Sequence, residues 1–159
     1  MPLANRWISE QWRVAGIECS DDAATAPVRL GFDGPGERWR FAGHTIELHR
    51  SEAEGYFLNI TAPDPKVFVM WRMIEDVGDS DVGPRIRPQL VTVSYNEAAR
   101  FLDGGEQVDA VPLPVDIRDW VQPFVAEHYR PEPKRKNRRN ELYERESAAG
   151  DAPPGRRNR

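Results

Sequence analysis

The sequence predicts an α+β fold in which an antiparallel sheet of about six strands carries two C-terminal helices, followed by a disordered basic tail. Short apolar or alternating runs separated by Gly, Pro and Asp indicate strands in the first two thirds of the chain. Between residues 94 and 128 the apolar spacing changes to that of helices. The charge also changes sign at Pro131. Residues 1–130 carry 13 Lys/Arg and 21 Asp/Glu (net −8), and residues 131–159 carry 9 and 5 (net +4). We therefore expect one domain at 1–130 and a disordered tail at 131–159.

The expected strands are short and are separated by polar turns. The sequence GFDGPG at 31–36 predicts a turn, because glycine tolerates positive φ angles. The run KVFVMWRM at 66–73 is apolar on both faces until Arg72, which favours a central strand. Pro88 lies early in the last expected strand, where an edge position or a bulge would accommodate it. The six expected strands are residues 11–17, the two arms of a hairpin over 38–50 that bends at 42–44, residues 56–60, residues 66–73 and residues 85–93.

Two helices are expected after the strands. Ser94 and Glu97 have the spacing of a capping box, in which each side chain bonds the other residue's backbone amide, and Gly104 is the expected left-handed cap. Pro114 suits the first position of the second helix, and Pro123 predicts one kinked helix or two abutting ones. The apolar face of the second helix is expected to hold Ile117, Trp120, Val121, Phe124, Val125 and His128.

Composition excludes several classes of protein. Cys19 is the only cysteine, so neither an intramolecular disulfide nor a site with several cysteine ligands can form. The apolar runs are too short to span a membrane, and the first residues, MPLANRWISEQW, lack the apolar region of an export signal. We therefore expect the cytoplasm. The acidic body would repel phosphates, which makes nucleic acid an unfavourable partner for it.

Two stretches of the sequence contain potential metal ligands. The stretch with His44, Glu47 and His49, followed by Glu52 and Glu54, could hold a divalent ion, but such residues on a hairpin are more often solvated. The acidic loop 75–83 could bind calcium, but it departs from the EF-hand pattern, and Arg85 and Arg87 offer local charge pairing instead. No cofactor is predicted.

The expected contact residues lie near the two ends of the chain. Trp7 precedes the first expected strand, so its large apolar side chain is a candidate for partner binding, whereas the other four tryptophans are assigned to packing. The tail is expected first to be a disordered, solubilising extension, and the alternative is a segment that folds on a partner with an acidic surface or on nucleic acid. Its candidate contact residues are Lys134, Arg135, Lys136, Arg138 and Arg139.

Several runs resemble an uncharacterised bacterial domain family. They are ANRWISEQWRVAGI, IELHRSEAEGYFLNI, PKVFVMWRM and the segment from RPQLVTVSYNEAARF to QPFVAEHY, which together cover essentially residues 4–130. Members of that family are often encoded beside formate dehydrogenase genes, and some carry the label molybdopterin-guanine dinucleotide biosynthesis protein A. The nucleotidyltransferases of that name begin with a glycine-rich Leu-Ala-Gly-Gly type loop, which this chain lacks, so the label does not describe its activity. Relatives carry one more apolar strand before the first run, so we expect that this chain is one strand shorter or that its start lies upstream.

The resemblance implies an accessory role for a molybdenum- or tungsten-dependent formate dehydrogenase. We therefore expect a non-catalytic protein that binds a formate dehydrogenase subunit or its maturation machinery. Two alternatives stay open: an enzyme or cofactor binder whose pocket would be lined by Glu47, His49 or Arg72, and a regulator that binds nucleic acid through the tail.

Overall fold

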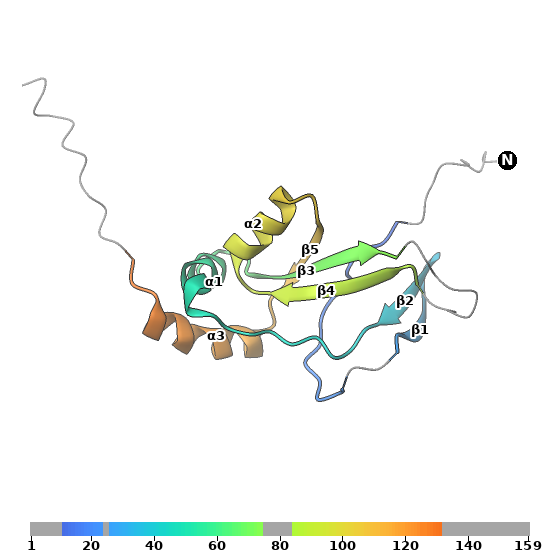
Figure 1. Ribbon diagram of the computed structural model, residues 1–159. Helices are drawn as coiled ribbons and strands as arrows, with labels where there is room; N and C mark the ends of the chain where they lie inside the picture. The colour runs from blue at the N-terminus through green and yellow to red at the C-terminus, as the bar shows by residue number, and fades with distance from the viewer. Residues whose placement is uncertain (1–10, 24–25, 75–83, 132–159) are drawn as a thin grey trace, which may run out of the picture.

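The computed structural model describes residues 11–23, 26–74 and 84–131 (Figure 1). Its mixture of helices and antiparallel strands confirms the α+β class. The elements in chain order are β1 (Val28–Asp33), β2 (Gly36–Arg40), the 3-10 turn η1 (Arg50–Glu52), α1 (Ala53–Ile60), β3 (Lys66–Met73), β4 (Ile86–Thr92), α2 (Tyr95–Asp103), β5 (Gln107–Pro112) and α3 (Val115–His128).

The strands form two sheets, so the expected single sheet of about six strands is wrong. One sheet has the order β4-β3-β5 and the other is the hairpin β1-β2. The central position predicted for β3 is confirmed. The β3–β4 register shifts between Met70, which faces Leu90, and Trp71, which faces Pro88. The bulge expected near this proline is therefore present, and β4 is also an edge strand. No strand was expected between the two C-terminal helices, but β5 lies between α2 and α3.

Three of the expected strands are not strands. Residues 11–17 and 41–49 have no regular secondary structure, and only 38–40 of the expected hairpin belong to a strand. Some of their apolar side chains still pack on the core, because an apolar pattern reports which side chains are buried and not whether the backbone pairs. The side chains concerned are Val14, Ile17, Ile46 and Leu48.

The expected strand at 56–60 is the second half of helix α1. Ala53, Tyr56, Phe57 and Ile60 follow the i, i+3, i+4, i+7 spacing of a helix face, and Ala53 and Tyr56 are buried. The run YFLNI was too short to separate strand from helix by its own pattern. The helix-favouring residues before it, Glu52 to Glu54, carry the missing signal.

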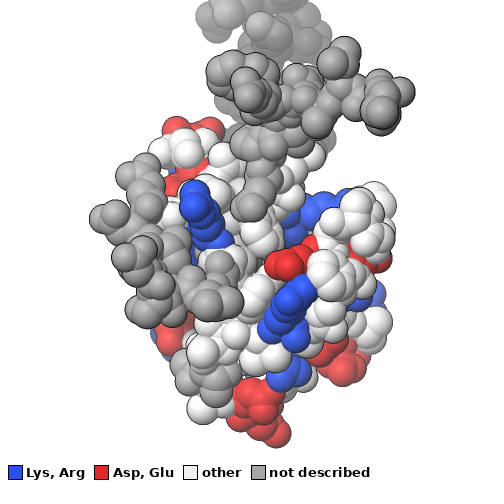
Figure 2. All heavy atoms as spheres, turned by 90° about the vertical axis from the view of Figure 1, so that its right-hand side faces the viewer, with Lys and Arg blue, Asp and Glu red and all other residues white. Residues whose placement is uncertain are grey.

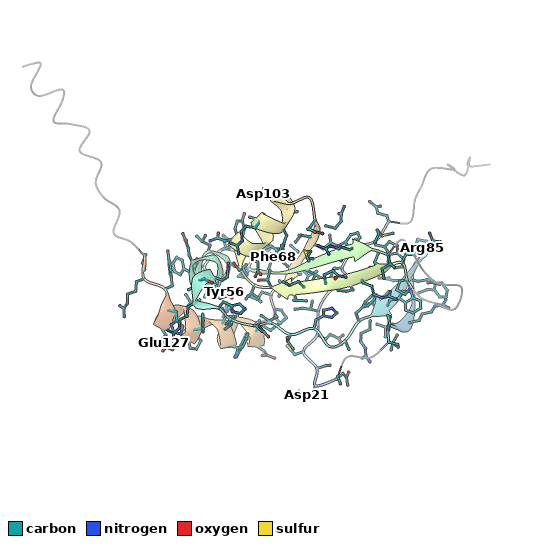
Figure 3. All side chains as sticks on the ribbon, in the orientation of Figure 1. Asp21, Tyr56, Phe68, Arg85, Asp103 and Glu127 are labelled. Carbon is teal, nitrogen blue, oxygen red and sulfur yellow. The ribbon has the colours of Figure 1, made fainter. Side chains whose placement is uncertain are left out.

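The main core lies between the three-stranded sheet and helices α1 and α3 (Figures 1 and 3). In Figure 1, α2 lies above the sheet and α3 below it, with α1 at one end. The buried cluster consists of Tyr56, Val67, Val93, Val111, Ile117, Val121 and Val125. The face predicted for α3 is confirmed at the last three of these, whereas Trp120 is 52% exposed. The helix runs unbroken through Pro123.

Two predicted helix ends differ in detail. Gly104 has a φ of −78°, and the left-handed residue is Gly105, with a φ of 81°. The amide of Glu106 donates to the carbonyl of Phe101 at 3.0 Å, which closes the end of α2. Pro114 is the N-cap of α3 and not its first helical residue.

Candidate functional site

The most extensive polar cluster joins α1 to α2, and we call it the α1–α2 junction: Glu52, Thr92, Ser94, Glu97 and Arg100. The Ser94 side chain has no exposed surface. Its hydroxyl accepts the amide of Glu97 at 3.1 Å and donates to Oε2 of Glu52 at 2.6 Å. Arg100 donates to the other oxygen of Glu52. The capping serine therefore also fixes the preceding helix.

The second hydrogen bond of the predicted capping box, from the Ser94 amide to the Glu97 side chain, is replaced by two bonds through Thr92. The hydroxyl of Thr92 donates to the Glu97 carboxylate at 2.6 Å and accepts the amide of Ser94 at 3.1 Å. Thr92 thus lies between the two groups that a capping box would join directly. A serine beside a carboxylate can be a nucleophile, but a substrate cannot reach a hydroxyl with no exposed surface. The junction is suited to holding helices in place.

A second group of polar contacts anchors α1 to the sheet. The Asn59 side chain is 2% exposed, and its amide nitrogen donates to the carbonyls of Lys66 at 2.7 Å and Val93 at 2.8 Å. Its oxygen accepts the amide of Lys66 at 2.9 Å. Three backbone groups that the strands leave unpaired are satisfied by one side chain, which is what a buried carboxamide requires.

Tyr56 joins α1 to the irregular segment before it. Its hydroxyl accepts the amide of His49 at 3.0 Å and donates to the carbonyl of Glu47 at 3.4 Å. Burial raises the pKa of the Tyr56 phenol, and the hydrogen bond from His49 opposes that shift. The neutral hydroxyl is therefore the stable form, and its role is to position the segment.

The potential metal ligands named from the sequence do not lie around a common point. His44 lies with Nε2 3.1 Å from the carbonyl of Pro88, and His49 lies 3.7 Å from Glu47 at an exposed position. Glu52, the next acidic residue, belongs to the α1–α2 junction. In the described part of the chain no three His, Cys, Asp or Glu side chains are grouped so that they could hold a metal ion. The acidic loop 75–83 lies outside the described residues.

The pocket that would favour an enzyme is also not assembled around the residues named for it. Arg72 forms a two-bond ion pair with Glu106, at 2.9 and 2.5 Å. A hollow of about 230 Å³ lies elsewhere, at the end of α1 beside α3. It is lined by exposed or half-buried side chains: Ile60, Thr61, Arg118 and Gln122.

A different kind of surface is formed by the β1–β2 hairpin, residues 28–40. Val28, Leu30 and Phe32 are 43%, 55% and 68% exposed. The hairpin is joined to the body just after β2, where the guanidinium of Arg87 lies 5.7 Å from the centre of the Phe41 ring. Figure 2 looks onto this end of the molecule, where basic and acidic side chains are interspersed among uncharged ones.

The apolar side chains of the hairpin were missed at the sequence level. Val28, Leu30 and Phe32 alternate with other residues, which is the signal of a strand, but only the turn after them was identified. The contact residues predicted instead were Trp7 and the five basic residues of the tail. All of those lie outside the described residues, so their role remains a prediction.

Of three comparisons with known proteins, the one with protein families found a match. Residues 1–138 match the family model described as "Protein of unknown function (DUF3305)". No curated protein and no solved structure matches the chain. Within the described ranges, no helix is both long and apolar enough to cross a membrane.

Proposed function

Because the chain belongs to the family described as proteins of unknown function (DUF3305), whose description assigns no activity, we propose a function from its surface. In this proposal the chain is a non-catalytic accessory protein that binds another protein, and its role is linked to the maturation or assembly of a formate dehydrogenase. The observation that carries the binding role is the exposure of Val28, Leu30 and Phe32 on the β1–β2 hairpin. Single exposed apolar residues are ordinary, whereas three on one short strand leave apolar surface on both faces of the hairpin, because Val28 lies opposite Arg40 and Phe32 lies opposite Glu37.

The architecture of the hairpin supports the same role. An isolated two-stranded ribbon is only marginally stable in water. Within the described residues, β1 and β2 pair with each other and with no third strand. A partner that covers the apolar side chains would bury surface worth about 25 cal/mol per Å² and would stabilise the ribbon as it binds. Association would therefore stabilise the hairpin itself.

The link to formate dehydrogenase rests on the resemblance to a family often encoded beside its genes. The partner we propose is a subunit of that enzyme or a component of its maturation machinery. The basic tail, with Lys134 to Arg139, and Trp7 remain proposed additional contacts. An electrostatic contact through the tail would weaken as salt is added, because exposed charges are screened over about 8 Å at physiological ionic strength.

The test is affinity purification of the full-length protein from its host during formate metabolism. We expect formate dehydrogenase subunits or maturation proteins with the unaltered chain and their loss with Leu30→Glu. The matched control is Leu102→Glu on α2, because Leu30 and Leu102 are 55% and 57% exposed. A full-length variant with Gln in place of the five basic tail residues measures the contribution of the tail; these are Lys134, Arg135, Lys136, Arg138 and Arg139. Recovery of none of these proteins with the unaltered chain would overturn the proposal.

A further inference from the structure

We infer that the outer edge of strand β5 binds an extended segment of another protein in which apolar side chains alternate with lysine or arginine. The site is separate from the β1–β2 hairpin and goes beyond the function proposed above. We call it the β5 edge: the outward side of Val108, Asp109 and Ala110, together with Tyr95 of α2. It follows from the register of β5, from the position of α2 over the sheet and from the charges beside the strand.

The register shows which backbone groups of β5 point away from the sheet. β5 pairs with β3 on one side and, within the described residues, with no strand on the other. The amide of Leu113 donates to the carbonyl of Pro65 at 2.9 Å. This bond fixes the alternation of the ladder, so that every second residue from Leu113 back to Gln107 directs its backbone groups to β3. The residues that direct theirs outward are Val108, Ala110 and Pro112. Pro112 agrees with this assignment, because a proline without an N–H is tolerated where a strand faces away from the ladder.

The outward groups of Val108 and Ala110 are available to another chain. No hydrogen bond within the described part of the protein uses their N–H or C=O groups, and Ala110 is exposed. The two residues together offer two donors and two acceptors. Backbone groups in this arrangement bind an extended segment as an added strand of the sheet. The chemistry of the edge therefore calls for extended peptide backbone.

Helix α2 adds an apolar side chain above the β5 edge. Glu97 lies on the β4 side of α2, because its carboxylate accepts the hydroxyl of Thr92 at 2.6 Å. Tyr95 is two residues away, about 200° around the helix, and so lies on the other side. Its ring centre is 6.1 Å from that of Phe68, whose neighbour in β5 is Ala110. Tyr95 is nevertheless 55% exposed, because the sheet ends at β5 beneath it. An added strand would place a side chain against this ring.

A carboxylate lies on the opposite face of the strand. Side chains alternate along β5, so Asp109 points to the other face from Val108 and Ala110. One oxygen of Asp109 accepts the amide of Val14 at 2.7 Å. A carboxylate has room for further hydrogen bonds, and in the described chain Asp109 forms no ion pair. A residue of the added strand that lies beside Asp109 would therefore be favoured if it carried a positive charge.

The charges around the β5 edge favour the same partner. Arg72 neutralises Glu106 in the ion pair described above. Asp103 and Asp109 have no such partner among the described residues, and the nearest unmatched cation along the chain is the exposed Arg13, next to Val14. Two carboxylates thus face one arginine, on a domain whose residues 1–130 have a net charge of −8. A basic segment is attracted to such a surface and an acidic one is repelled.

A second copy of β5 is a poor occupant of the edge. The strand reads QVDAVP and contains no cation. Its side chains on the face of Asp109 are Gln107, Asp109 and Val111, so a copy would add negative charge without neutralising any. The segment that fits places apolar side chains opposite Val108 and Ala110, beneath Tyr95, and a lysine or arginine between them, beside Asp109.

The experiment measures binding of a short fluorescein-labelled peptide of alternating Lys and Val to the full-length protein by fluorescence anisotropy. We expect saturable binding that weakens as salt is raised, little binding of a Glu-Val peptide and weaker binding of a Lys-Ser peptide. Ala110→Pro should weaken binding of the Lys-Val peptide about tenfold, since it removes an outward N–H and puts a ring in the path of the added strand. The ladder with β3 does not use that N–H, so urea denaturation should find the variant folded.

Asp109→Asn tests the charge with a smaller change. It should weaken binding of the Lys-Val peptide about threefold, because it removes an exposed ion pair while the amide oxygen still accepts the amide of Val14. The matched control is Asp21→Asn, which removes one carboxylate from an exposed position in a loop that Figure 3 shows below the sheet and away from Phe68.

Two outcomes concern the variants. Unchanged affinity of a folded Ala110→Pro variant would overturn the inference, because the backbone of β5 would then not carry the contact. Equal loss in Asp109→Asn and Asp21→Asn would also overturn it, because the effect would be one of overall charge. A dimer of the unaltered protein in sedimentation, dissociated by Ala110→Pro, would overturn it in favour of a second copy.

The two proposals fail separately. Peptide binding without recovery of formate dehydrogenase proteins would remove only the proposed function. Recovery of those proteins with a chain that does not bind the Lys-Val peptide would remove only this inference.

Discussion

Replacement of Gly55 by alanine should separate the two helices that the α1–α2 junction holds together. A Cβ atom built on Gly55 would lie 2.1 Å from Oγ of Ser94 and 3.2 Å from the amide nitrogen of Asn96. The first contact is too short for non-bonded atoms, and the second is tight enough that the neighbouring backbone would have to shift by a few tenths of an ångström. Because Ser94 is fully buried, its side chain has no open direction in which to move. Either the hydroxyl gives up its hydrogen bonds or α1 moves away from the start of α2.

The size of the effect follows from the contacts that would be lost. Loss of the N-cap bond from Ser94 to the amide of Glu97 costs about 1 kcal/mol. Loss of the bond to the charged Glu52 costs about 2 kcal/mol. Alanine favours a helix over glycine by about 1 kcal/mol, which offsets part of this. The free energy of unfolding should therefore fall by about 2 kcal/mol, which lowers the Tm of a domain of this size by about 8 °C.

Urea denaturation followed by circular dichroism measures this change. Gly16→Ala is the control, because a Cβ there meets no atom within 4 Å and should leave stability nearly unchanged. In a Ser94→Gly background the side-chain atoms of Ser94 are absent and only the contact with the Asn96 amide remains, so Gly55→Ala should cost much less than in the unaltered protein. An equal cost in both backgrounds would show that the contact with Ser94 is not the cause. Unchanged stability of Gly55→Ala alone would refute the close approach of the two helices.

Two further predictions concern single side chains. Asn59→Asp should destabilise the protein by about 3 kcal/mol in urea denaturation, because a buried carboxylate would replace the amide donor that faces two backbone carbonyls. The control is Asn96→Asp in the first turn of α2, which should be nearly neutral or slightly stabilising. Equal effects of the two variants would contradict the role of the buried carboxamide. The hydrogen bonds from Arg72 lower the pKa of Glu106, so their contribution to stability is present above the ordinary carboxyl pKa and is lost as pH falls through the lowered one. Arg72→Met should therefore be less stable than the unaltered protein at neutral pH, and the difference should shrink in acid; a difference independent of pH down to the acid range would contradict the ion pair as its source.

The sequence predicted those elements whose local signal and tertiary role agree. The run 66–73 is apolar on both faces, and β3 is the central strand. The spacing of Ser94 and Glu97 predicted the start of α2, and in the structure the hydroxyl of Ser94 accepts a hydrogen bond from the amide of Glu97. The periodic positions Ile117, Val121 and Val125 are buried in α3. In each case a single pattern of residues serves both local structure and burial.

The candidate site was predictable only in part. The turn at 31–36 was identified, and the alternation of Val28, Leu30 and Phe32 would have indicated the strand before it. The division of the hairpin into two faces could not be obtained in this way, because it depends on the register shift between Arg29 and Gly31. One inserted residue reverses which side chains share a face. That irregularity depends on how the two strands pair.

By itself, the sequence determined the class of fold, the central strand, the cap of α2 and the acidic charge of the body, because each follows from neighbouring residues or from composition. Only the tertiary structure decided that alternating runs such as 11–17 would pack without pairing, and that the strands would divide into a three-stranded sheet and a separate hairpin. The physical reason is that backbone pairing and side-chain contact join residues far apart in the chain. Local patterns record that a side chain is to be buried, but not the partner that buries it.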